Sequence, residues 1–284
     1  MLSSTRPAPS TSTGVSTSYL LFPCRLGLTR VVPADPKKEL VDPAVIGTTG
    51  ILKALKRSAP GVKRVVVTSS FASVLDEAQF FNPEHTFSEA SWNPAGLDDI
   101  HSSPATAYRV SKTLAEKAAW AFVESEKPAW DLVTVTPPLV LGPVVHHLAS
   151  LSSINTSNER VVKLLQGAWK DEIPGQGPVS LWIDVRDLAK AHVAAFEKPE
   201  AGGKRLFTTA GLFSNSEIAA IVREKFPEFK DKVPGPEVRG GERPALDKSF
   251  KWNTEQTDKL LGFEWTSLEK SISDLVDSLK THGV

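Results

Sequence analysis

The chain contains almost no cysteine: Cys24 is the only one in 284 residues. A single cysteine excludes an internal disulfide and a cysteine-rich metal site, and it is typical of a reducing compartment. We therefore expect a cytoplasmic protein. His146 and His147 are adjacent, so their side chains point apart, and no third ligand lies nearby in sequence. The sequence thus predicts no metal site.

The sequence also lacks an excess of charge of either sign, since 33 basic residues balance 33 acidic ones. This balance gives no support for a nucleic-acid partner. No apolar run approaches the roughly 20 residues that cross a bilayer, so no membrane association is expected. A hydrophobic content of 40% is ordinary for a globular protein and sufficient for one large α/β domain or two modest ones.

Acidic residues are absent from the start of the chain, where the first is Asp35. Residues 1–34 are rich in serine and threonine and are interpreted as a leader outside the main domain, 35–284. This composition is also found in transit peptides, so import into mitochondria is the less favoured alternative to a cytoplasmic location. A disordered leader and non-native sequence are the other readings.

From residue 35 onward, stretches with helical periodicity alternate with continuous β-branched runs. Strands are predicted at 65–68, 130–137, 179–185 and 205–211, and helices are expected near 36–59, 107–126, 158–168, 188–198, 214–226, 253–262 and 266–280. This alternation predicts an α/β fold with a parallel sheet and crossover helices. Asp187, Ser214 and Thr266 are expected to cap three of the later helices, and Gly262 is expected to end the helix near 253–262. His192 is expected to be a packed helix residue.

Tyrosine is scarce, with 2 residues in the chain, yet Tyr108 stands four positions before Lys112. Residues four apart lie on one helix face. An ammonium group close to a phenol favours the phenolate and lowers the phenol pKa from about 10. Such a pair suits proton transfer to a substrate oxygen, although the same spacing also occurs by chance on surface helices.

Two further stretches lie at ends of predicted strands. Ser70 closes Thr68-Ser69-Ser70, and the segment "TPPLVLGP" follows the strand at 131–135. Ligands of open α/β sheets bind outside the carboxyl ends of the strands. A hydroxyl there can hydrogen-bond a carbonyl, and prolines fix backbone carbonyls toward a ligand. The sequence therefore predicts one site at this edge.

Several stretches, in this order, resemble the extended short-chain dehydrogenase/reductases of the NAD-dependent epimerase/dehydratase superfamily. The closest resemblance is to the branch with dihydroflavonol reductases, cinnamoyl-CoA reductases and yeast-type NADPH-dependent methylglyoxal reductases. The stretches are "DPAVIGTTGILKAL", "VKRVVVTSSFASV", "SWNP", "AYRVSKTLAEKAAW", "TPPLVLGP", "INTS", "IDVRDLAKAHVAAFEKP" and "KLLGFEW". The resemblance implies a Rossmann-type doubly wound parallel sheet with a smaller C-terminal substrate-binding region, mainly 146–178 and 203–284.

The resemblance also implies roles for individual residues. Ser70 matches the serine that orients the carbonyl, Tyr108 the proton donor, and Lys112 the lysine that lowers the tyrosine pKa and holds the nicotinamide ribose. The cofactor-binding residues are then Tyr108, Lys112, Pro137, Val140 and Ser157. The implied reaction is reduction of a small aldehyde or ketone by NADPH, or by NADH, in a monomer or homodimer.

One part of the family pattern is missing, namely the glycine-rich turn that binds the cofactor pyrophosphate. Gly47 and Gly50 lie within a helical stretch and follow no strand. We therefore expect a chain that lacks the first βαβαβ part of the fold. Two alternatives to the reductase follow: a catalytically inactive remnant or interaction protein that binds no cofactor, and an epimerase, dehydratase or hydroxysteroid dehydrogenase of the same superfamily.

Overall fold

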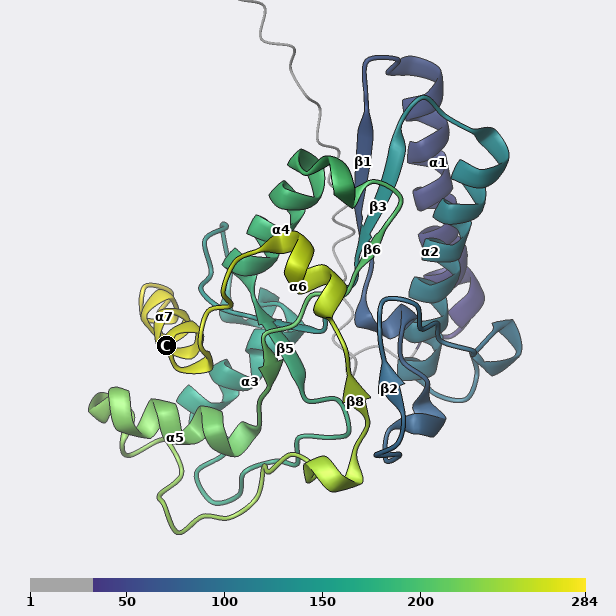
Figure 1. The fold of residues 1–284 in the computed structure, drawn as a ribbon. Helices are drawn as coiled ribbons and strands as arrows, with labels where there is room; N and C mark the ends of the chain where they lie inside the picture. Colours follow the sequence, from purple (N-terminus) through teal and green to yellow (C-terminus); the bar gives the residue numbers. More distant parts are fainter. Residues whose placement is uncertain (1–32) are drawn as a thin grey trace, which may run out of the picture.

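The computed structural model describes residues 33–284, so the predicted leader lies almost entirely outside the described residues (Figure 1). Seven α-helices occur in this part: α1 (Asp42–Ser58), α2 (Pro104–Glu126), α3 (Thr156–Leu165), α4 (Val185–Glu197), α5 (Asn215–Lys225), α6 (Glu255–Leu261) and α7 (Leu268–Lys280). The strands are β1 (Arg64–Thr68), β2 (Thr86–Phe87), β3 (Asp131–Val135), β4 (Leu139–Leu141), β5 (Leu181–Asp184), β6 (Arg205–Leu206), β7 (Gly211–Leu212) and β8 (Lys251–Trp252). The shorter helices include η1 (Lys37–Val41) and η2 (Phe71–Ser73).

The first sheet is parallel and has the order β1-β3-β6. Helices α1 and α2 cover one face and α4 lies across the other (Figure 1). The strand β1 alternates between the two layers: Val65 and Val67 pack toward α1 and α2, whereas Val66 packs toward α4. Because both faces are covered, every residue of the run can be apolar, as its continuous β-branched pattern predicts.

The second sheet has the order β4-β5-β7, with β5 parallel to β4 and antiparallel to β7. Its core is closed by α3, α5 and α7. The helix α7 shows why: Ile272, Leu275, Val276 and Leu279 recur at three- and four-residue spacing and are all fully buried. This apolar stripe docks the C-terminal helix onto the rest of the core. A third, short sheet pairs β2 with β8.

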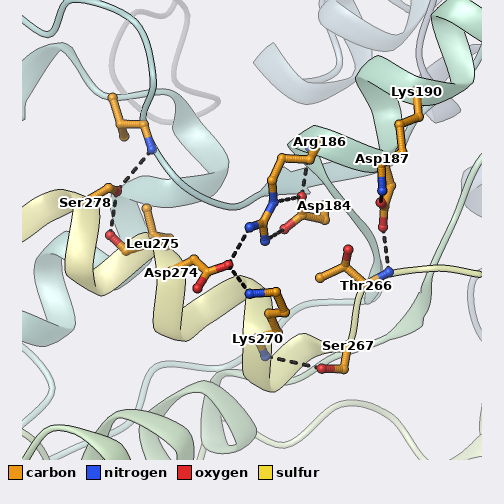
Figure 2. Close-up of polar contacts among 11 residues, drawn as sticks. Asp184, Arg186, Asp187, Lys190, Thr266, Ser267, Lys270, Asp274, Leu275 and Ser278 are labelled. Carbon is orange, nitrogen blue, oxygen red and sulfur yellow. Dashed lines mark hydrogen bonds and ion pairs between the residues drawn. The ribbon is translucent and has the colours of Figure 1, made fainter.

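Ion pairs fasten α7 to the start of α4 at the rim of this second region (Figure 2). The guanidinium group of Arg186 donates to Asp184 at 2.8 Å and also to Asp274 on α7. Lys270 adds a second donor to Asp274 at 2.9 Å. The carboxylate of Asp184 is fully buried, so it needs the donors of Arg186 to remain ionised.

Two predicted helix caps are wrong by one to three positions. The N-cap of α4 is Asp184, whose side chain accepts from the Arg186 N–H at 2.8 Å, and not Asp187. The Asp187 carboxylate is buried in the first turn and accepts from the Thr266 N–H at 2.6 Å. That contact holds Thr266 outside α7, which begins one residue later with Ser267 as its cap. The contact between Asp187 and Thr266 thus engages both predicted caps, and Asp184 and Ser267, which are equally good capping residues, take their places.

Other local predictions are confirmed. Ser214 caps α5 by accepting from the Glu217 N–H at 3.1 Å, and Gly262 ends α6 with a left-handed φ of 70°. Gly47 and Gly50 lie inside α1, as expected from their helical surroundings. The predicted strand near 205–211 divides into β6 and β7, which belong to different sheets. None of the helices in residues 33–284 is both long and apolar enough to span a bilayer.

Candidate active site

Ser70 lies directly beyond the carboxyl end of β1. The Ser69 N–H donates to the Val135 carbonyl of β3 at 2.8 Å, so the pairing of the two strands continues to this point. Ser70 itself has an extended backbone and caps η2, its Oγ accepting from the Ala72 N–H at 3.1 Å. A hydroxyl that accepts through a lone pair keeps its own hydrogen for donation. The position therefore suits a donor to a ligand oxygen at the sheet edge.

The helix α2 carries Tyr108 and Lys112 in its first three turns. It begins at Pro104 after Ser103, whose hydroxyl accepts from the Thr106 N–H at 3.0 Å. The Lys112 Nζ donates to the Thr68 carbonyl oxygen at 3.4 Å, a contact between α2 and the end of β1. The structure thus brings Lys112 to within two residues of Ser70 along the strand end, and Tyr108 shares the helix face of Lys112.

A buried carboxylate on the same helix, Glu116, was missed by sequence reasoning. Its Oε2 accepts from the hydroxyl groups of Ser69, at 2.5 Å, and Ser73, and its Oε1 accepts from Thr134 at 2.8 Å. The Nε of Arg205 donates to the same Oε1 at 2.8 Å. Glu116 therefore accepts hydrogen bonds from Ser69 and Ser73, one on each side of Ser70. The only signal in the sequence was its place four residues after Lys112.

The charge of Glu116 is maintained by its partners. Burial raises the pKa of this carboxyl, but the attraction of Arg205 and the donors from Arg205, Ser69 and Ser73 outweigh burial, so the pKa lies below its ordinary value. Arg205 is held in turn by the carbonyls of Glu89 and Ser91, at 2.7 and 2.6 Å. Its guanidinium group also stacks 3.7 Å from the centre of the Trp92 ring.

The segment after β3 approaches the same edge. The Phe71 N–H donates to the Pro137 carbonyl at 2.8 Å, which places Pro137 beside Ser70. A carbonyl oxygen has two lone pairs, so with one of them engaged by this amide it stays a prediction that the Pro137 carbonyl faces a ligand. The Val140 N–H donates to the Ser157 Oγ at 3.2 Å. Pro137 is thus tied to the serine loop, and Val140 and Ser157 are tied to each other.

His192 of α4 reaches this edge from the opposite face of the sheet. It is a buried helix residue, as predicted. Its Nδ1 lies 2.8 Å from the Leu188 carbonyl, which can only accept, so Nδ1 carries the proton and Nε2 accepts from the Thr68 hydroxyl at 2.8 Å. Burial lowers the pKa of His192, and its hydrogen bond to Leu188 opposes this only partly. The ring is therefore a neutral support of the strand end.

The arrangement is that of an α/β protein in which a serine hydroxyl and a lysine ammonium group lie at the carboxyl end of one strand, with a phenol on the same helix face as the ammonium group. No cluster of three or more potential metal-ligating side chains occurs in the part of the chain that the structure describes. The groups present can donate hydrogen bonds and a proton to an oxygen atom. This edge also matches the place where open parallel sheets bind nucleotide cofactors.

Residues 32–208 match the NAD dependent epimerase/dehydratase family, and the chain belongs to this family. It is 39% identical over 248 residues to the ketoreductase azaE of Aspergillus niger, covering 86% of this chain and 70% of the relative. It is 37% identical over 249 residues to the NADPH-dependent methylglyoxal reductase GRE2 of Saccharomyces cerevisiae, covering 86% and 72%. These findings confirm the family resemblance that the motifs indicate.

Among solved structures, the chain is similar to Gre2 of Candida albicans in complex with NADPH. The TM-score is 0.79 at 31% identity, and the match covers 90% of this chain and 75% of that one. This likeness confirms the predicted Rossmann-type fold class.

Proposed function

We propose that the chain reduces an aldehyde or ketone to an alcohol with NADPH as the hydride donor. Reductases whose names or structures include NADPH are similar to most of the chain, which supports both the oxidoreductase class and the choice of NADP predicted from the sequence. The observation that carries the proposal is the contact of Lys112 Nζ with the Thr68 carbonyl. It sets the cation of the Tyr-x-x-x-Lys helix beside the strand end that bears Ser70.

The residues at this edge fit a nicotinamide nucleotide by the chemistry of their donors. Lys112 offers an ammonium group for ribose hydroxyls, and Tyr108 stands next to it on the helix face. Ser157 offers a hydroxyl, and the loop containing Pro137 and Val140 is fixed by backbone hydrogen bonds. We assign Tyr108, Lys112, Pro137, Val140 and Ser157 to cofactor binding. When bound, the reduced nicotinamide supplies a hydride to the substrate carbon.

The side chains of this protein then supply position and a proton. Ser70 donates a hydrogen bond to the carbonyl oxygen and so orients the substrate. Tyr108 transfers its phenolic proton to that oxygen as negative charge develops there. Lys112 stabilises the phenolate that remains, since a nearby cation favours the charged form of the phenol. Glu116 fixes the loop of Ser70 by accepting hydrogen bonds from Ser69 and Ser73.

The proposal extends to the remaining properties of the protein. The substrate is a small carbonyl compound, and residues 146–178 and 203–284 form most of its binding region. The protein acts as a monomer or homodimer and is located in the cytoplasm. No nucleic acid or membrane partner is needed for this chemistry.

The first test is the variant Tyr108→Phe, which removes the phenolic proton and little else. We expect turnover to fall by about 100- to 10,000-fold, the usual contribution of a general acid. The thermal midpoint of unfolding is expected to change little. Oxidation of NADPH with a panel of aldehydes and ketones measures turnover.

A titration with NADPH, followed by tryptophan fluorescence, is the control for cofactor binding by the same variant. Binding with loss of turnover supports the assignment of Tyr108 as the acid. Appreciable turnover in Tyr108→Phe contradicts it, and absence of NADPH binding by the unmodified chain favours the inactive remnant instead.

A further inference from the structure

Arg160 of α3 is a half-buried arginine surrounded by neutral groups. Its Nε donates to the Ser157 carbonyl at 3.1 Å. Its Nη1 donates to the side-chain oxygens of Gln176, at 3.1 Å, and Asn215, at 2.9 Å. Its guanidinium carbon lies 4.9 Å from the centre of the Phe213 ring. These contacts come from α3 itself, from the loop before β5 and from the residues around the start of α5, so the group is held in one orientation.

Three other arginines, whose side chains are largely buried, each have a carboxylate partner. Arg64 pairs with Asp131, Arg205 with Glu116, and Arg109 with Glu77. Within residues 33–284 no carboxylate forms an ion pair with Arg160. Burial lowers its pKa to about 10, so the group is still charged at neutral pH. A desolvated cation without a counter-ion is unfavourable, and an anion from outside the described fold would correct this.

One nitrogen of Arg160 is available for such an anion. Nε and Nη1 together use all three of their hydrogens on protein acceptors. Nη2 makes no hydrogen bond to any residue from 33 to 284, and it is not among the sealed polar atoms without partners. It therefore keeps two donors that are open to solvent. Because only one nitrogen is available, it suits a hydrogen bond to one carboxylate oxygen better than binding of a phosphate, which usually accepts from several donors.

The position of Arg160 connects this donor to the reductase site. Arg160 is bonded to the carbonyl of Ser157, and the hydroxyl of Ser157 is bonded to the Val140 N–H of β4. Gln176 lies in the loop before β5, and Asn215 is the first residue of α5. The arginine thus stands where the proposed cofactor-binding strand meets the proposed substrate-binding region.

We propose that Arg160 binds a carboxylate carried by the carbonyl substrate, so that the preferred substrates are keto acids or aldehyde acids. The inference rests on the proposed reductase function and adds a specificity-determining residue to it. Arg160 takes no part in proton or hydride transfer. It selects the substrate by a charge-assisted hydrogen bond from Nη2.

The experiment compares keto acids with their ethyl esters, using pyruvate, 4-oxopentanoate and 5-oxohexanoate, with NADPH and the full chain. In Arg160→Gln, we expect kcat/KM for the best acid to fall about 10- to 100-fold, the effect of one hydrogen bond to a charged group. For the matching ester we expect a change of less than about twofold. Arg160→Lys keeps the charge and is expected to recover part of the activity toward the acid. Lys163→Gln removes one exposed charge from the same helix and is the matched control.

Three outcomes would overturn the inference while leaving the reductase function intact. An equal loss for acid and ester means that Arg160 only supports the fold. A loss confined to the KM for NADPH means that the anion is a phosphate of the cofactor. A preference of the unmodified protein for every ester over its acid means that no carboxylate is bound. If the unmodified protein reduces no carbonyl compound at all, the proposed function itself fails, and this inference with it.

Discussion

The two main regions of the molecule place their ion pairs differently. Around β1, β3 and α2, a fully buried carboxylate and a buried guanidinium are joined, Glu116 to Arg205, beneath the candidate active site. Around β4, β5, α3 and α7, the hydrophobic core is closed by helices, and the ion pairs of Arg186 with the buried Asp184 and with Asp274 lie at its rim (Figure 2). The first region gains a fixed geometry from polar contacts, whereas the second gains its stability mainly from apolar packing.

The difference indicates where each region can accept a ligand charge. Glu116 has five donors within hydrogen-bond distance. We call this a closed network, because both carboxylate oxygens are fully engaged by the protein and do not need a ligand donor. Arg160, which is half-buried in the other region, has neutral partners and one nitrogen without a protein partner among residues 33–284. A closed network positions catalytic groups, because any displacement leaves a buried polar group unsatisfied. An open network, in which one donor has no protein partner, can bind a charged group of a substrate.

The largest effect is expected where the closed network is broken. Glu116→Gln leaves the guanidinium of Arg205 buried without its counter-ion, which costs about 3–5 kcal/mol in the free energy of unfolding. Glu124→Gln removes a carboxylate from an exposed position of the same helix and should change the stability by about 0.5 kcal/mol or less. Urea denaturation followed by tryptophan fluorescence measures both variants.

Turnover tests the positioning role of Glu116 separately from its role in stability. In the folded Glu116→Gln protein at low temperature, we expect kcat to fall while the NADPH dissociation constant is nearly unchanged. The reason is that the loop of Ser70 loses hydrogen bonds, whereas the residues that we propose to bind the cofactor keep theirs. A loss of stability below about 1 kcal/mol would contradict the buried ion pair. Unchanged kcat in a destabilised but folded variant would contradict the positioning role.

The sequence indicated individual residues of the candidate site, but not the contacts between residues that are far apart in the chain. Tyr108 and Lys112 were found by helical spacing, and Ser70 by its place after a β-branched run, since both patterns are local. The joining of Glu116 to Arg205 depends on residues 89 positions apart, which meet only when β6 pairs with β3. No local pattern reports such a contact. Only the register of Glu116 on the Tyr108 face could have suggested it.

The fold class and the order of elements were predictable for the same reason. Apolar periodicity and turn residues act over a few positions, whereas the choice between neighbouring caps was made by a distant partner. Asp184 and Asp187 are equally suited to cap α4, and the Thr266 N–H decides between them by engaging Asp187. Arg160 likewise resembles any charged helix residue until Gln176 and Asn215 are brought beside it.

A smaller effect is expected at His192, which lies on the boundary between the two regions. Its pKa in the folded protein is lowered by burial, so the unfolded chain binds more protons when the pH falls below about 6.5. Stability contributed by neutral His192 is therefore fully present above that value and lost as the pH falls. The loss is at most about 1.4 kcal/mol per pH unit.

Thermal unfolding at about pH 7.5 and pH 5.5 tests this, above the range in which carboxyl groups titrate. The unmodified protein should lose more stability between the two values than His192→Gln, which can still accept from Thr68 but cannot gain a proton. His101→Gln at an exposed position is the matched control. Equal pH dependence in the unmodified protein and in His192→Gln would show that the ring is not held neutral.

The smallest effect distinguishes two neighbouring hydroxyl residues at the start of α7, in the apolar region. Ser267 accepts from the Lys270 N–H at 3.3 Å, so Ser267→Ala should lower the free energy of unfolding by about 1 kcal/mol. Thr266→Ala removes a hydroxyl that caps nothing and leaves the backbone contact to Asp187 in place, so its effect should be near zero. Thermal unfolding compares the two variants directly. A larger loss for Thr266→Ala would move the start of α7 back by one residue, and it would mean that the Asp187 contact does not set where the helix begins.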